Sequence, residues 1–134
     1  MEDIIQLTKD LIRFRTTPSH PGEILRCADF IVNYLQDCRA GFRRFDYGDT
    51  PSILVGPSMD FAPVLLMAHY DVVEGPIELF APFEKEGKLY GRGSVDDKYA
   101  VALALVLLKN HLQGLRKIER SQSDLPFGLS LIHI

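Results

Sequence analysis

The sequence predicts an α/β domain in which helices interleave with short strands to form a layered core. Two observations carry this prediction. Apolar residues recur at three- and four-residue steps in the first part of the chain, which is typical of amphipathic helices. The pattern then changes to short apolar segments bounded by Gly, Pro, Asp and Thr, which is typical of strands. A long apolar helix is expected after the strands.

Two amphipathic helices are expected at the start of the chain. The first covers about residues 4–14 and ends before Pro18. The second has Pro21 in its first turn, runs to about Cys38 and ends before Gly41. The apolar stripes comprise Ile4, Leu7, Leu11 and Phe14 in the first helix, and Ile24, Ala28, Ile31 and Leu35 in the second.

Three strands, a loop and a fourth short strand are expected next. The three strands cover residues 42–47, 52–55 and 64–68. Residues 64–68 are apolar throughout, as in a central strand that is covered on both faces. The loop covers residues 74–86, and residues 88–90 form the short strand.

A third helix is expected from Val95 to about His111. Ser94 and Asp97 have the spacing of a capping box at its start. The helix is apolar nearly all round, so it should be buried against the sheet. The periodicity is lost from Arg116 onward, which predicts an irregular tail over residues 116–134.

The end of this tail has a second explanation. Residues 129–134 match one translation of CTG TCT CTT ATA CAC ATC, which resembles a transposon end used in preparing sequencing libraries. We hypothesise that the tail is not native and that the reading frame was interrupted within or after the third helix. Native coding sequence that continues in frame past Ile134 without this string would contradict the hypothesis.

Composition excludes some classes of partner. The chain has 134 residues, with 15 Lys and Arg against 18 Asp and Glu, which gives no electrostatic reason to bind nucleic acid. Its longest apolar run, Tyr99 to Leu108, is far shorter than the roughly 20 residues of a membrane-spanning helix. We therefore expect neither a nucleic-acid partner nor a membrane.

The cysteines and the first residues favour a cytoplasmic location. Cys27 and Cys38 fall on one expected helix, where a rise of about 1.5 Å per residue keeps them too far apart for a disulfide. The start at Met1 is acidic and lacks the basic and apolar regions of a secretory signal. Free thiols and no leader are typical of a reducing compartment.

The first candidate site is His69-Tyr70-Asp71. On an extended segment, His69 and Asp71 point to the same side, so the carboxylate can orient a metal-ligating imidazole. Chance also produces His-x-Asp in a chain with 4 His, so the motif alone is weak. Its place at the carboxyl end of an apolar strand, where open α/β sheets bind ligands, favours a site.

The second candidate site is the segment Gly91-Arg92-Gly93-Ser94-Val95-Asp96-Asp97-Lys98. Its glycines allow a tight turn, and its two carboxylates then lie at a helix start, where anionic groups are favoured. A purely structural interpretation stays open. In it, Asp97 caps the helix, Asp96 interacts favourably with the helix dipole and Lys98 is solvated.

Together the motifs resemble the di-zinc metallopeptidases, a family of aminoacylases, acetylornithine and succinyl-diaminopimelate deacylases, carboxypeptidase G and dipeptidases. The resemblance is carried by His69-Tyr70-Asp71-Val72-Val73, Pro82-Phe83 and Gly87 to Lys98, and it covers about residues 1–115. It implies the amino-terminal part of a three-layer, zinc-exopeptidase-like catalytic domain with a mixed sheet.

The resemblance also implies roles for individual residues. His69 would ligate one zinc, Asp71 would orient His69 as a catalytic positioning group, and Asp96 would bridge two zinc ions. The peptide bond after Asp96 would be cis, and Asp97 would be positional. Cobalt or manganese could replace zinc.

The sequence departs from the family pattern without removing a ligand. Glu74 stands where proline is common, Glu78 and Ala81 stand where Trp and Asp are common, and Tyr99 replaces a glycine. These departures weaken the choice of subfamily, although Asp-Asp-Lys favours the dipeptidases and carboxypeptidases over the desuccinylases.

Part of the implied machinery is missing. The family takes its general base from a Glu-Glu pair, and this sequence contains none. His20, His111 and His133 are ligand candidates by residue type only, and Glu84 and Glu86 are better explained as solvated residues than as a replacement base.

The implied function is zinc-dependent hydrolysis of an amide or peptide bond by the full-length protein, with a small peptide or an N-acyl amino acid as substrate. We expect this chain to be an inactive fragment, and dimerisation only in the full-length protein. Two alternatives stay open: a non-catalytic binding module and one half of a split enzyme.

Overall fold

Three α-helices form one layer of the molecule. The computed structural model describes residues 2–132, and its helices are α1 (Glu2–Ile12), α2 (Pro21–Asp37) and α3 (Lys98–Lys117). The two helices expected at the start of the chain are confirmed. Helix α2 begins at Pro21, where a missing N–H costs nothing, and its buried residues include those of the expected stripe.

A mixed four-stranded sheet forms the second layer. Its strands are β1 (Arg43–Tyr47), β2 (Thr50–Val55), β3 (Leu65–His69) and β6 (Gly128–Ile132). The order across the sheet is β1-β2-β6-β3. β6 runs antiparallel to β2 and parallel to β3. The expected α/β class with a mixed sheet is thus confirmed, as are the first three expected strands.

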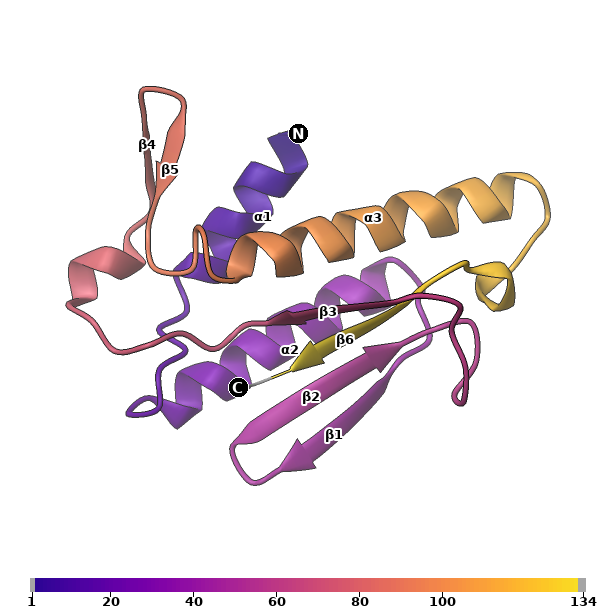
Figure 1. Cartoon of the computed structure of the whole chain (residues 1–134), viewed down its shortest axis with the longest axis horizontal. Helices are drawn as coiled ribbons and strands as arrows, with labels where there is room; N and C mark the ends of the chain where they lie inside the picture. The colour runs from indigo at the N-terminus through magenta and orange to yellow at the C-terminus, as the bar shows by residue number, and fades with distance from the viewer. Residues whose placement is uncertain (1, 133–134) are drawn as a thin grey trace.

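The core lies between this sheet and the helices. Pairing places Ile53 opposite Leu131 and Val55 opposite Leu129, so these four buried side chains share one face of the sheet. They belong to one apolar cluster with buried residues of all three helices named above. Helices α1, α2 and α3 therefore cover the same face (Figure 1). Residues 2–132 thus provide two layers of the expected three-layer architecture.

The expected irregular tail is wrong for residues 128–132. These residues form β6, which lies between β2 and β3. Leu129 and Leu131 are wholly buried, whereas Ser130 between them is partly exposed. This alternation is a strand pattern with one face on the core. A one-turn 3-10 helix, η2 (Gln122–Asp124), precedes the strand.

The expected capping box at the third helix is also wrong. Helix α3 begins at Lys98, and the side chain of Asp97 makes no capping hydrogen bond. The helix extends six residues beyond the expected end at His111, to Lys117. Arg116 and Lys117 suit the last turn, because cations interact favourably with a helix carboxyl end.

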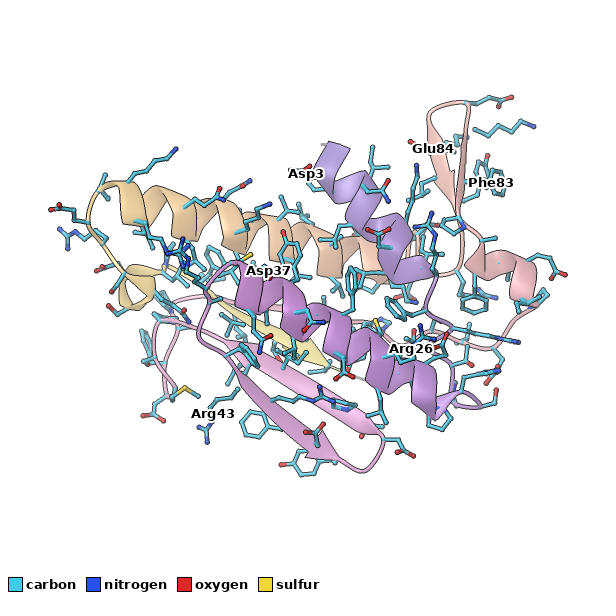
Figure 2. The ribbon with its side chains drawn as sticks, turned by 180° about the vertical axis from the view of Figure 1, so that it is seen from behind. Asp3, Arg26, Asp37, Arg43, Phe83 and Glu84 are labelled. Atoms are coloured by element: carbon cyan, nitrogen blue, oxygen red, sulfur yellow. The ribbon has the colours of Figure 1, made fainter. Side chains whose placement is uncertain are left out.

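The expected loop after β3 carries structure of its own. It contains a 3-10 helix, η1 (Ile77–Phe80), and the strand β4 (Phe83–Lys85), which pairs with β5 (Lys88–Tyr90) in a hairpin. The hairpin projects from the body of the molecule (Figure 1). Figure 2 shows Glu84 on the side of the hairpin toward α1, where its carboxylate pairs with Lys9.

Candidate functional site

The two predicted ligands meet at the carboxyl end of β3. The Nε2 atom of His69, the last residue of β3, lies 2.9 Å from Oδ1 of Asp96. The side chain of Asp96 is 83% exposed, whereas that of His69 is 20% exposed. The imidazole is therefore held by the fold, and the carboxylate lies at the surface. The two sequence motifs thus lie next to each other in the structure, as the family resemblance implies.

Asp71 lies on the other ring nitrogen of His69. The Nδ1 atom is 3.1 Å from the backbone oxygen of Asp71 and 3.3 Å from its carboxylate Oδ1. The expected same-side placement of the two side chains is thus observed, and the backbone oxygen adds a nearer acceptor. With Nδ1 occupied in this way, the ring presents Nε2 to Asp96. This is the arrangement that orients metal-ligating histidines.

The protonation equilibrium of His69 reflects these partners. Burial of the ring favours its neutral form and so acts to lower the pKa. The hydrogen bond to the Asp71 backbone oxygen and the contact with the Asp96 carboxylate act in the opposite direction. Together with the charges of Asp71 and Asp97, these interactions outweigh the effect of burial, and the pKa of His69 is raised above its ordinary value.

The segment before α3 brings Asp96 and Asp97 to the site. The peptide bond between them is cis, as the family resemblance implies. Oδ2 of Asp97 lies 3.4 Å from the backbone N–H of His69, which donates to it. Gly93 has φ of +96°, a conformation that L side chains rarely adopt. The glycine therefore permits the turn that leads into the two carboxylates.

Lys98 is a functional candidate that the sequence interpretation missed. The structural interpretation of the motif takes this lysine as solvated, but it is wholly buried. Its Nζ donates hydrogen bonds to the backbone oxygens of Leu11, at 2.8 Å, and Phe14, at 2.6 Å. Burial disfavours the charged form and lowers the pKa of Lys98 to about 8.

A signal for this burial is present in the sequence. Lys98 precedes Val101, Ala102 and Leu105 by three, four and seven positions, so it lies on the buried stripe of α3. A lysine on such a stripe needs buried acceptors, because an unpaired charge in the core is costly.

A cavity of about 640 Å³ opens beside these groups. It is lined by Pro18, His69, Asp71, Val72, Val73 and residues 91–96. Both predicted ligands and the orienting carboxylate contribute to its wall. The cavity has the size of a small-molecule site.

The donor set fits zinc as part of a site. Imidazole nitrogen and carboxylate oxygen are common zinc ligands, and His69 and Asp96 bring one of each together. A catalytic zinc normally takes about three protein ligands. Within residues 2–132, no group of three or more His, Cys, Asp or Glu side chains could hold a metal ion.

The remaining histidine candidates lie elsewhere. The Nδ1 atom of His20 is 2.8 Å from the hydroxyl of Thr17, in the loop before α2. His111 packs edge-on against Phe127, with ring centroids 5.4 Å apart. His133 lies outside the described residues. Neither His20 nor His111 lines the cavity at His69.

The two glutamate candidates also lie elsewhere. Glu84 is on β4 and pairs with Lys9, and Glu86 is an exposed residue with φ of +53° in the hairpin turn. Neither lines the cavity at His69. Their placement agrees with an interpretation as surface residues rather than as a general base.

None of the described helices combines the length and apolar character that crossing a bilayer requires.

Comparison with known proteins identifies relatives by sequence. Residues 65–121 match the model of peptidase family M20/M25/M40. The chain is 34% identical over 120 residues to a succinyl-diaminopimelate desuccinylase from Xylella fastidiosa strain M12, covering 84% of this chain and 30% of that protein. It is 40% identical over 67 residues to human N-fatty-acyl-amino acid synthase/hydrolase PM20D1, covering 42% of this chain and 13% of that protein.

Solved structures share the fold. Human carnosine dipeptidase 1 superposes with a TM-score of 0.72 at 21% identity, over 98% of this chain and 31% of that one. The M20 family metallo-carboxypeptidase Sso-CP2 from Sulfolobus solfataricus gives 0.72 at 19% identity, over 99% and 30%. The chain thus spans about 30% of the length of the desuccinylase. The chain is thus similar in sequence to peptidase family M20/M25/M40 over residues 65–121, and it shares its fold with solved structures that include an M20 family metallo-carboxypeptidase.

Proposed function

We propose that this chain is part of a zinc-dependent hydrolase of amide or peptide bonds. The observation that supports this most directly is the 2.9 Å approach of His69 Nε2 to Asp96 Oδ1, beside a cavity of small-molecule size. Members of the family and relatives of this chain are named as peptidases, desuccinylases and dipeptidases. We propose a small peptide or an N-acyl amino acid as the substrate class and the cytoplasm as the location.

Each of the three site residues has a distinct proposed role. His69 is a ligand to one zinc ion through Nε2, and Asp71 holds the ring by accepting from Nδ1. Asp96 would be the carboxylate shared by two zinc ions, and its side chain is 83% exposed. Zinc, when bound, supplies a Lewis acid for the scissile carbonyl and lowers the pKa of a bound water.

We propose that residues 1–115 are the amino-terminal part of a catalytic domain and that this chain alone does not turn over substrate. A water nucleophile needs a group that accepts its proton. Residues 91–98 bring carboxylates to the site, but these are assigned to metal and to the His69 backbone. The general base and the remaining ligands would then come from the part of the relatives that this chain does not span.

A second candidate function is one half of a split enzyme. The specific observation in its favour is the combination of the contact between His69 and Asp96 with a span of only 30% of the desuccinylase. A separate polypeptide would then supply the base and the remaining ligands. In that case the isolated chain binds zinc weakly and gains activity only with its partner.

Zinc titration of the isolated chain tests the proposed function. We expect weak binding that is lost in His69→Ala and in Asp96→Ala and retained in His20→Ala, a histidine outside the site. An amidase assay with an N-succinyl amino acid and a dipeptide should show no turnover. Zinc binding that survives both ligand substitutions would overturn the ligand assignment.

Turnover by the isolated chain with two tightly bound zinc ions would contradict the proposal that this chain is an inactive fragment. A folded monomer that binds neither zinc nor substrate would instead favour a non-catalytic binding module.

A further inference from the structure

Residues 11–16, at the end of α1 and just after it, contact both halves of the site. On one side, the Thr16 hydroxyl donates to the backbone oxygen of Tyr70 at 2.5 Å, and the Val72 N–H donates to the backbone oxygen of Thr16 at 2.9 Å. Tyr70 and Val72 are the residues on either side of Asp71. The segment thus fixes the chain that carries the orienting carboxylate and follows His69 directly.

On its other side, the same segment receives Lys98. The Nζ atom donates to the backbone oxygens of Leu11 and Phe14, where the first helix ends. These oxygens lie in the last turn of α1 and just after it, where they also accept from the backbone N–H groups of Phe14 and Thr16. Lys98 is two positions after Asp96, so this contact fixes the start of α3 and the segment that carries Asp96. Figure 1 shows the end of α1 beside the start of α3.

Packing around Lys98 leaves its side chain little freedom. A methyl group added at Gly93 would lie 2.8 Å from Cγ of Lys98 and 2.9 Å from its Cδ. Gly93 therefore leaves room for the buried stem of the lysine. Both Lys98 and Thr16 are wholly buried. Their hydrogen bonds are shielded from water, and such bonds determine geometry more strictly than exposed ones.

We infer that Lys98 and Thr16 are positioning residues, which together set the distance between His69 and Asp96 by anchoring both ligand segments on residues 11–16. Neither Lys98 nor Thr16 lines the cavity at His69, and the hydrogen bonds of both side chains go to backbone oxygens, so both act through the backbone. The two ligands lie 27 positions apart in the sequence and on different elements. Both ligand-bearing segments are hydrogen-bonded to residues 11–16. This inference rests on the proposed function only in naming the pair as zinc ligands.

The first arm of the test needs no metal. In the full chain, the Asp96→Asn substitution should move the ¹⁵N resonance of His69 Nε2, because it changes the nearest partner of that atom. The same substitution is then made in Lys98→Met and Thr16→Val backgrounds, which keep side-chain size and remove the donor. We expect the change in resonance to disappear in both. Leu112→Ala, a buried change near the far end of α3, is the matched control and should retain it.

The second arm measures zinc affinity by competition with a chromophoric chelator. Lys98→Met and Thr16→Val should weaken zinc binding about 10-fold. This is the lower end of the loss in metal affinity that follows when residues that orient a ligand are replaced. Thr16→Ser, which keeps the hydroxyl, should bind as the unsubstituted chain does, and so should Leu112→Ala. General loss of stability cannot produce this pattern, because Leu112→Ala also disturbs the core.

The outcomes distinguish the positioning role of Lys98 and Thr16 from the proposed zinc-dependent function. An undiminished resonance change in folded Thr16→Val or Lys98→Met protein would overturn the positioning role, whatever the zinc affinity. Zinc binding that is unaffected by His69→Ala would overturn the proposed function, and the resonance arm would still decide the positioning role. If Lys98→Met does not fold, Thr16→Val and Thr16→Ser decide the result.

Discussion

His69 and Asp71 form a pair in which the aspartate occupies the ring nitrogen that faces away from Asp96. The Nδ1 atom lies 3.1 Å from the backbone oxygen and 3.3 Å from the carboxylate of Asp71. The main-chain oxygen is present whatever the side chain at this position. The carboxylate adds negative charge, which makes the imidazole a better ligand and selects one tautomer. The two contributions can be separated by substitution.

Asp71→Asn should weaken zinc binding by roughly 10- to 100-fold while leaving the fold intact, because it removes the charge and keeps the shape. Isothermal titration with zinc measures the affinity, and circular dichroism checks the fold. Asp10→Asn, on the exposed side of α1, is the control and should bind as before. Equal affinity in the two variants would assign the orientation of His69 to the backbone oxygen alone.

Two glycine substitutions should change stability in opposite directions. Gly93→Ala places a methyl group against Lys98 at φ of +96° and should cost about 1–3 kcal/mol. Gly114→Ala, inside α3 with no neighbouring atom within 4 Å of the new methyl group, should stabilise by about 0.5–1 kcal/mol. Urea denaturation measures both. A neutral Gly93→Ala variant would show that the packing around Lys98 is loose.

The Cys27 thiol should be inert in the folded chain. Burial raises its pKa from 9.0 to about 12, so the reactive thiolate is scarce at neutral pH. At pH 8, iodoacetamide should modify Cys27 only after unfolding. Rapid labelling of Cys27 in the native chain, located by mass spectrometry, would contradict its burial.

The same shift predicts a loss of stability at high pH. The pKa is higher in the folded state, so the contribution of Cys27 is complete below pH 9.0 and is lost as the pH rises toward about 12. Cys27→Ala should remove this part of the pH dependence. The difference between the two chemical denaturation curves across this range measures it. Parallel curves for the two proteins would assign the loss to other groups.

The two edges of the sheet should differ in self-association. β1 carries Arg43, Arg44 and Asp46, and charges protect an edge from pairing with another chain. β3 forms the opposite edge, and its Leu65 and Met67 are exposed and uncharged. We therefore expect the isolated chain to associate through β3.

Replacing both Leu65 and Met67 by lysine should shift the chain toward monomer in sedimentation velocity. Tyr47→Lys, which also replaces an exposed apolar side chain but on the β1 edge, is the matched control. It should leave the association unchanged. Equal effects of the two variants would show that added charge, and not the position of the edge, controls association.

The helices and most strands could be predicted because their signals are local. The stripe of α2 at Ile24, Ala28, Ile31 and Leu35 is buried as its spacing requires. His69 and Asp96 could be paired because the motifs occur together in one family. The strand β6 was missed, although Leu129 and Leu131 alternate with Ser130, because a segment of five residues carries a weak periodic signal.

The contacts of Lys98 could not be predicted in the same way. Its acceptors, the backbone oxygens of Leu11 and Phe14, lie 87 and 84 positions earlier in the chain. Backbone oxygens carry no residue identity, so no motif marks them as partners. A lysine is also most often found in solvent. The start of α3 was misplaced for a related reason, because Ser94 and Asp97 have capping spacing while Asp97 contacts the backbone of His69 instead.

The strand order also has a consequence for synthesis on the ribosome. β2 and β3 do not pair with each other, because β6 lies between them. A nascent chain can therefore form the β1–β2 hairpin early, but β3 and its terminal His69 have no neighbouring strand until residues 128–132 have emerged. Such late, non-local closure is slow. The ligand pair would then acquire its final geometry only after translation has passed β6.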